Sequence, residues 1–76
     1  MRLSNVKKGD QVTIVEIDAD LQTQQELFSL GILPGDTLQV ISSGFLGGPL
    51  ALRHEQNTFF ALRREYAGNI LVQVNE

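Results

Sequence analysis

The side chains that could carry metal or acid–base chemistry are few in this 76-residue chain, and they are spread along it. His54 is the only histidine, there is no cysteine, and the nine acidic residues are scattered. A metal site in a protein needs two to four soft or charged ligands at workable spacing. His54 alternates with Leu50 and Leu52, which favours a histidine at the edge of the core or on the surface. The sequence therefore predicts no metal site and no cofactor.

Nucleophilic and phosphate-binding chemistry is no better supported. The serines lie in no segment that resembles a nucleophile elbow, and the only histidine belongs to another element. The glycine-rich stretch at 44–49 lacks the Gly-Lys-Ser/Thr ending of a phosphate-binding loop, so we interpret it as a connection between strands. We expect no catalytic residues, and a protein that is not an enzyme.

Composition limits the remaining function classes. Seventy-six residues with 42% hydrophobic content are enough for one small core, so we expect a single domain over 1–76. The net charge of −3 argues against a general nucleic-acid binder, which needs basic charge to neutralise phosphates. No apolar run is long enough for a membrane span or a secretory signal. We therefore expect a cytoplasmic protein that does not insert into membranes.

The elements that must position any binding surface can be read from the apolar pattern. Residues 12–17 are rich in β-branched side chains and predict a strand, in which a shift of apolar phase indicates a bulge or burial on both faces. Residues 20–30 predict a helix with Asp20 as N-cap, which ends at Gly31 because Pro34 prevents its continuation. A second strand at 38–42 follows, with Leu38 and Val40 inward.

The second half predicts more β-structure. Residues 50–55 and 58–63 form a hairpin around Gln56-Asn57, residues 64–67 a short helical turn, and 70–74 a last strand. Five short strands with one inserted helix indicate a mainly β protein built as a small barrel. The Gly9-Asp10 and Gly35-Asp36 corners would each start a strand with a sharp turn.

The candidate contacts that remain are on the surface. Phe45 and Leu46 lie among glycines, where no periodic pattern requires them to be buried, so they either contact a partner or cover the open end of the barrel. The stretch 63–66 combines arginine and tyrosine, which interfaces favour, although Tyr66 could equally lie on the core.

The order of motifs resembles the FeoA family, the small protein A of ferrous iron transport. It runs V-x-x-G-D, then L-x-x-L-G-I-x-P-G-D-x-L-x-V, then G-G-P-L-A-L, then F-A-L-R-R-E-Y-A-x-N-I-L-V, from about Leu3 to Val74. The resemblance implies an SH3-like five-stranded barrel with an inserted helix. By position, the family motifs fall on the helix-end corner and on a second signature: Leu30, Gly31, Pro34, Gly35, Ala61, Leu62, Arg63 and Ala67.

The resemblance also implies a non-catalytic accessory of ferrous iron uptake, which contacts the cytoplasmic portion of the FeoB membrane transporter. Our hypothesis for the partner-binding residues joins the helix-end corner to the central loop: Leu27, Leu30, Gly31, Pro34, Gly35, Phe45, Leu46 and Arg64.

Other interpretations stay open at this point. A stand-alone SH3-like regulatory or peptide-binding module would resemble the C-terminal domain of iron-dependent repressors, and weak self-association is a further option. An RNA-binding small barrel is disfavoured by the acidic composition. Direct iron binding through His54 has little support, because the sequence offers few further ligands.

Overall fold

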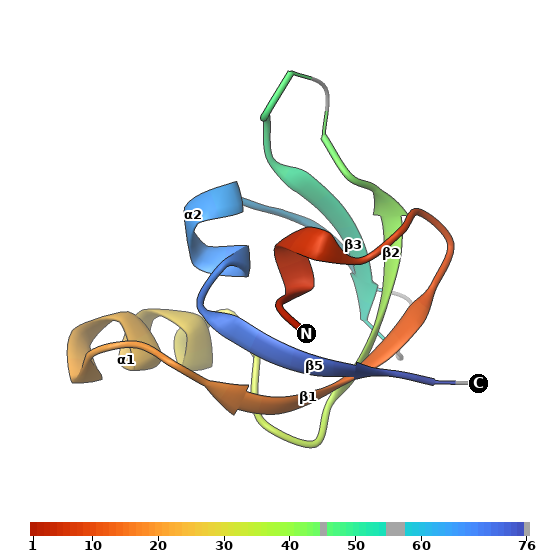
Figure 1. Cartoon of the computed structure of the whole chain (residues 1–76). Helices are drawn as coiled ribbons and strands as arrows, with labels where there is room; N and C mark the ends of the chain where they lie inside the picture. Colours follow the sequence, from red (N-terminus) through yellow and green to blue (C-terminus); the bar gives the residue numbers. More distant parts are fainter. Residues whose placement is uncertain (45, 55–57, 76) are drawn as a thin grey trace.

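The protein folds around one antiparallel sheet of five strands in the order β4-β3-β2-β1-β5 (Figure 1). The computed structural model describes residues 1–44, 46–54 and 58–75. Its elements, in chain order, are η1 (Leu3–Asn5), β1 (Gln11–Ile17), α1 (Leu21–Ser29), β2 (Thr37–Ser42), β3 (Leu50–His54), β4 (Phe59–Leu62), α2 (Arg64–Ala67) and β5 (Ile70–Val74).

The predicted elements are confirmed, with small shifts at their ends. The mainly β architecture, the inserted helix and the helical turn at 64–67 are all present. The hairpin is present as the β3–β4 pair, but its Gln56-Asn57 connection lies outside the described residues. The turn of 3-10 helix η1 was not predicted, because three residues are too few to show a periodic pattern.

The shift of apolar phase in β1 comes from a bulge. The register against β5 slips between Ile14 and Glu16, so that Ile14 and Ile17 are both buried although they are three positions apart, a spacing that would place them on opposite faces of a regular strand. The extra residue leaves Val15 on the outside, where its side chain is 56% exposed. Of the two explanations that the sequence allowed, the bulge is therefore confirmed.

Both Gly-Asp corners are tight turns with the same backbone conformation. Gly9 and Gly35 each have a φ of +94°, a region that a Cβ disfavours. In each corner the aspartate amide donates to the carbonyl three residues back, at 3.2 Å for Asp10 and 3.1 Å for Asp36. The Asp36 carboxylate also accepts a bond from the Leu33 amide at 3.1 Å, as expected of an aspartate that ties a turn.

Each corner is bound to the strand that the other corner starts. The Gly9 amide donates to the Val40 carbonyl at 2.7 Å, and the Gly35 amide donates to the Ile14 carbonyl at 2.8 Å. In return, the Val40 amide donates to the Asp10 backbone carbonyl at 3.0 Å, and the Ile14 amide donates to the Asp36 backbone carbonyl at 2.9 Å. The corners are thus related by an approximate two-fold axis through the β1–β2 ladder, and each one extends that ladder at its end.

Helix α1 begins and ends as the sequence predicts. The Asp20 side chain accepts the Thr23 amide at 2.8 Å, which caps the first turn and lowers the pKa of this carboxyl below its usual range. Gly31 has a φ of +82° after the last turn. The helix is nevertheless a peripheral element, since Leu27 is the one residue of α1 that is buried.

The core is a single cluster of apolar side chains, and no polar side chain in the described part of the chain is buried. It draws on every strand and both α-helices: Leu3, Val6, Val12, Ile14, Ile17, Leu27, Ile32, Leu38, Val40, Leu50, Leu52, Leu62, Ala67, Ile70 and Val72.

The sheet curves strongly but does not close, and its two edges differ. On the outer edge of β5, the Val72 amide donates to the Met1 carbonyl at 2.7 Å, and Arg2 forms a bridge with Leu71. The first residues of the chain therefore cover that edge. β4, at the opposite end of the strand order, has β3 as its strand neighbour.

The corner glycines should be sensitive to substitution for a backbone reason alone. A Cβ at Gly35 would meet no atom within 4 Å, so Gly35→Ala adds no clash and tests the left-handed conformation. We expect it to lower the free energy of unfolding by about 1–2 kcal/mol in urea denaturation. Gly68→Ala is the matched control, because Gly68 has a helical φ of −66° and should change stability by less than about 0.5 kcal/mol. Equal losses in the two variants would contradict this explanation.

Candidate partner-binding surface

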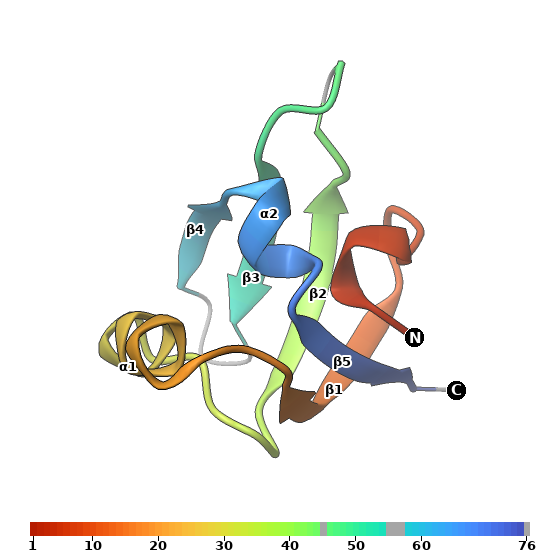
Figure 2. The ribbon, with the colours of Figure 1, turned by 60° about the vertical axis from the view of Figure 1, so that its left-hand side comes forward.

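The predicted contact residues fall into two groups at opposite ends of the molecule. Helix α1 and the corner that follows it lie at one end, and the loop between β2 and β3 projects at the other (Figures 1 and 2). The structure therefore does not bring the helix-end corner together with the loop. A partner would have to meet two separate patches, or only one of them.

Leu27 lies in the core and not on either patch. Its side chain is 0% exposed, so it is not available to a partner in this conformation. Its carbonyl accepts the amides of Leu30 and Ile32, at 3.1 and 3.0 Å, where the chain leaves the helix. Leu27 thus anchors the helix-end corner to the core through these two backbone hydrogen bonds, and Ile32 is buried as well.

The helix-end corner presents an apolar surface around its predicted residues. Leu30 is 59% exposed, and Gly31, Pro34 and Gly35 are exposed beside it. Two residues outside the predicted set add to this surface, since Leu33 is 45% exposed and Phe28 is 41% exposed. The sequence did not single out Phe28 as a surface residue, because it follows Leu21 by seven positions, which is the spacing of one apolar helical stripe.

The loop between β2 and β3 carries Leu46 at its tip. Leu46 is 90% exposed and has a φ of +53°, which is uncommon for any residue other than glycine. The base of the loop is narrow, because a Cβ on Gly44 would come within 2.3 Å of the Gly48 carbonyl oxygen. Phe45, the other predicted residue of this loop, lies outside the described residues. The close approach at the base holds Leu46 away from the core.

Arg64 connects the loop to the body of the protein. Its guanidinium donates from Nη2 to the Ser43 carbonyl and from Nη1 to the Ser4 carbonyl, the latter at 3.5 Å. Its Nε is buried and has no hydrogen-bond partner among the described atoms. The Arg64 side chain is thus used inside the molecule, and a partner contact at Arg64 would have to compete with these two bonds.

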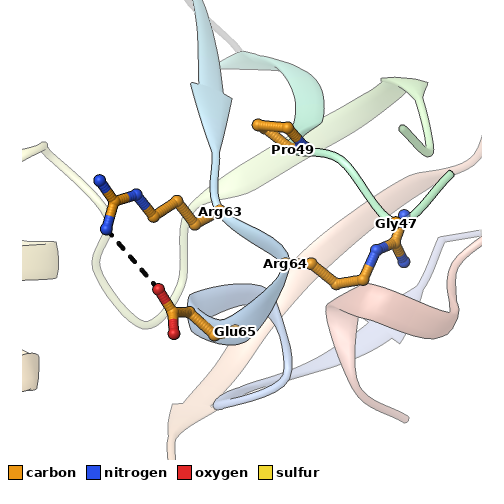
Figure 3. A pocket seen from close by; sticks show the side chains of 5 residues that line it. All are labelled: Gly47, Pro49, Arg63, Arg64 and Glu65. Atoms are coloured by element: carbon orange, nitrogen blue, oxygen red, sulfur yellow. Dashed lines mark ion pairs between the residues drawn. The ribbon is translucent and has the colours of Figure 1, made fainter. Parts of the chain in front are cut away.

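A hollow of about 230 Å³ lies between this loop and α2 (Figure 3). Gly47 and Pro49 line one side, and Arg63, Arg64 and Glu65 line the other. Arg63 projects away from Pro49 and lies 3.7 Å from the Glu65 carboxylate. Both side chains of this pair are more than 70% exposed, so the pair adds little stability and leaves the guanidinium free to exchange partners.

Tyr66 joins the two helices. Its hydroxyl donates to a Glu26 carboxylate oxygen at 3.0 Å, so this side chain is partly committed to α1. The hydrogen bond and the negative charge of Glu26 both favour the neutral phenol and raise the pKa of Tyr66 above its usual value. Because Tyr66 also packs against the core, it is not a freely exposed interface residue.

His54 lies at the edge of the core, as the sequence predicts. Its Nε2 is 3.3 Å from the Asp36 carboxylate, and both side chains are about one-fifth exposed. In the described part of the chain, no group of three or more His, Cys, Asp or Glu side chains is placed to hold a metal ion. We therefore interpret the His54–Asp36 pair as a structural contact between β3 and the helix-end corner.

Comparison with known families gives one match that covers nearly the whole chain. The model described as the FeoA domain matches residues 1–74. No curated protein sequence shows significant similarity to the chain. Among residues 1–44, 46–54 and 58–75, neither α-helix has the length and apolar composition needed to cross a bilayer.

Solved structures agree with this match. An iron uptake regulatory protein, FeoA, is 29% identical with a TM-score of 0.89, over 99% of this chain and 97% of its own. FeoA from Stenotrophomonas maltophilia, solved in complex with zinc and described as a procaryotic SH3 domain protein, is 25% identical with a TM-score of 0.73, over 96% of this chain and 89% of its own. A manganese-dependent transcriptional repressor is 25% identical with a TM-score of 0.91, over 99% of this chain but 36% of its own.

The role of Arg64 in holding the loop can be measured. We expect Arg64→Gln to lower the free energy of unfolding by about 1–3 kcal/mol, since it removes charged donors from two carbonyls. Amide hydrogen exchange over residues 43–49 should also become faster. Arg63→Gln serves as control, because that side chain is 74% exposed and should leave both measurements nearly unchanged. If the two variants behaved alike, Arg64 would not be holding the loop.

The Tyr66–Glu26 contact predicts a pH effect that can be followed directly, because the chain has one tyrosine and no tryptophan. Absorbance of the tyrosinate should appear at higher pH than for free tyrosine, and Glu26→Gln should move it back down. A raised pKa stabilises the fold below the unfolded value near 10, and this contribution is lost as the pH rises through the folded value. The control Glu16→Gln, which removes an exposed carboxylate in β1, should leave the titration unchanged.

Proposed function

The chain belongs to the FeoA family, and from this membership we propose that it is a non-catalytic accessory protein of ferrous iron uptake. It works in the cytoplasm by binding the cytoplasmic portion of the FeoB transporter. The family match and the FeoA neighbours support the link to ferrous iron transport. The SH3-like architecture supports a role in protein contact, because it exposes apolar side chains from a small rigid core.

The observation that carries this proposal is the exposure of Leu46. An apolar side chain that is 90% exposed gains about 1.5–3 kcal/mol when a partner buries it. Its positive φ adds a second argument, since strained residues persist where the surrounding structure holds them and often mark functional sites. The closed base of the loop and the Arg64 bonds reduce the ordering cost of binding, because the tip is already positioned.

The helix-end corner provides the second contact region of the proposal. Leu30 and Leu33 are about half exposed in the helix-end corner, and Phe28, two residues before Leu30, is 41% exposed. We take these three side chains together as an apolar patch, and beside it the Asp36 carboxylate, which contacts His54 Nε2 at 3.3 Å, is only about one-fifth exposed. A patch of this kind suits the apolar centre of an interface with a polar rim.

Binding changes the transporter only if the affinity differs between its states. An accessory protein that binds the active form of FeoB more tightly than the other forms shifts the population toward that form. No chemical step on this chain is needed for such an effect. The size of the shift equals the difference in binding free energy between the two states of the transporter.

A regulatory module is the second candidate. The same fold covers 36% of a manganese-dependent transcriptional repressor with a TM-score of 0.91, so this architecture also serves as part of a larger regulator. In that case the apolar patches would bind a soluble protein and not a membrane transporter. A pull-down with this protein separates the two candidates. Capture of FeoB from detergent-solubilised membranes favours the transporter accessory, whereas capture of a soluble protein in place of FeoB favours the regulatory module.

The proposal predicts that both patches contribute to FeoB binding. We expect Leu46→Asn and Leu30→Asp each to weaken the Kd for purified FeoB about tenfold, since each removes an apolar contact. Asparagine tolerates a positive φ, so Leu46→Asn should keep the loop conformation. The measurement is a titration of detergent-solubilised FeoB with labelled protein.

Val15→Thr is the matched control for these two variants. Val15 is 56% exposed on β1, outside both patches, and its substitution should leave the Kd unchanged. Folded Leu46→Asn and Leu30→Asp proteins that bind as well as the wild type would contradict the proposed surface. Failure of the wild type itself to bind FeoB would contradict the proposed function.

A further inference from the structure

We propose that the outer edge of β4 binds an extended acidic segment of a partner protein, which adds as a sixth strand to the sheet. This site goes beyond the proposed function, because it uses neither Leu30 nor Leu46. The partner is identified by its chemistry: an extended backbone with an apolar residue and an acidic residue four positions apart. The inference stands on the backbone geometry of β4 and on the side chains at its two ends.

The two edge strands of the sheet differ in their backbone hydrogen bonding. The N-terminal residues cover the β5 edge with backbone bonds, such as the one from the Val72 amide to Met1. On β4, the described backbone bonds run to β3. Figure 2 shows β4 at the margin of the sheet, with β3 on one side and no described strand on the other. An uncovered edge of this kind is a template for an added strand.

The register identifies the groups that point outward. The His54 amide donates to the Thr58 carbonyl at 2.7 Å, which makes this a hydrogen-bonded pair of the β3–β4 ladder. Since such pairs alternate along antiparallel strands, Phe60 and Leu62 bond to β3, while Phe59 and Ala61 direct their amides and carbonyls away from it. The described hydrogen bonds include none to those outward groups. The edge thus offers donors and acceptors in the pattern that an added strand requires.

The side chains beside these groups favour particular residues in the added strand. Phe59 is 66% exposed and lies on the outer face with Ala61. Arg63 continues that alternation, is 74% exposed, and projects away from Pro49 and Arg64 (Figure 3). At about 3.3 Å per residue, Phe59 and Arg63 are roughly 13 Å apart. An apolar residue opposite Phe59 and an acidic residue opposite Arg63 would therefore be four positions apart on one face.

Charge favours an acidic segment over a second copy of this chain. Arg53 lies opposite Phe59 in the ladder and has no ion pair with a described carboxylate. Arg63 has a single weak pair with Glu65, which a stronger partner can displace. Two β4 edges paired with each other would place arginines from both copies along one interface, and neither β4 strand carries a carboxylate to pair with them. Self-association is therefore the competing outcome of the test.

The test uses a fluorescein-labelled, capped heptapeptide, Thr-Val-Thr-Val-Thr-Glu-Thr, whose first valine and glutamate have the required spacing. Fluorescence anisotropy measures its Kd for the full chain, and a peptide with glutamine in place of glutamate is the control. We expect the glutamate peptide to bind about twofold to fivefold more tightly at low salt. Arg63→Gln should abolish this preference without changing the Kd for the glutamine peptide.

The backbone contribution is tested by Ala61→Pro, which removes an outward amide that β3 does not use. Proline is tolerated on the open side of an edge strand, so this variant should fold, as a thermal melt would confirm. We expect it to weaken peptide binding about tenfold, whereas Ala61→Ser, which keeps the amide, should bind like the wild type. In the wild type, the Phe59 and Ala61 amides should exchange with solvent more slowly when the peptide is bound.

Three results would overturn this inference, in addition to a failure of the wild type to bind the peptide. They are equal Kd values for Ala61→Pro and Ala61→Ser, slower exchange elsewhere than on β4, and a wild-type chain that forms dimers through β4 in sedimentation. Leu46→Asn should bind the peptide normally, so loss of FeoB binding in that variant with intact peptide binding separates this site from the proposed function. A wild type that binds FeoB but not the peptide would overturn the β4 site alone.

Discussion

The reciprocal pairing of the two Gly-Asp corners with β1 and β2 is the interaction on which the rest of the structure depends. Each corner glycine amide bonds to the opposite strand, so the β1–β2 ladder is held at both of its ends by bonds that involve no other strand. Three residues before each glycine, Val6 and Ile32 are both buried and anchor the approach to the turn. The first corner thereby directs the chain start toward β5, and the second directs α1 toward the sheet. The backbone of each corner requires a positive φ, which glycine adopts without strain, and the same Gly-Asp turn therefore occurs at both ends of the ladder.

A small core leaves much of the chain free to carry exposed apolar side chains. The buried cluster comes mostly from the inward faces of the strands, with one residue from α1. Because the strands supply most of the buried side chains, the helix end and the loop between β2 and β3 can present leucines outward without loss of the fold. The bonds of Arg64 to two backbone carbonyls then fix the loop, so its tip is exposed and held in place at the same time. This combination suits a protein that acts by contact.

Much of the fold could be predicted from residue pattern. The strands were predicted from apolar and β-branched runs, and the helix ends from Asp20 and Gly31. The slip in apolar phase predicted either a bulge or burial on both faces, and the structure shows the bulge. The helix ends are local features, because each depends on bonds within a few residues. The bulge also depends on the pairing of β1 with β5. The candidate surface was predicted less well. Leu27 is buried, since its place on the inner side of α1 depends on how the helix lies against the sheet.

What the sequence determined by itself is therefore the set of elements, their turns and the family to which the chain belongs. Tertiary structure alone decided that the helix-end corner and the Leu46 loop lie at opposite ends, and that Arg64 holds the loop. It also decided that, among the described residues, no strand pairs with the outer edge of β4, while the N-terminus covers the edge of β5. The reason is physical: turns and caps follow from bonds between near neighbours, whereas exposure and edge pairing follow from which distant segments pack together, and no local pattern encodes that.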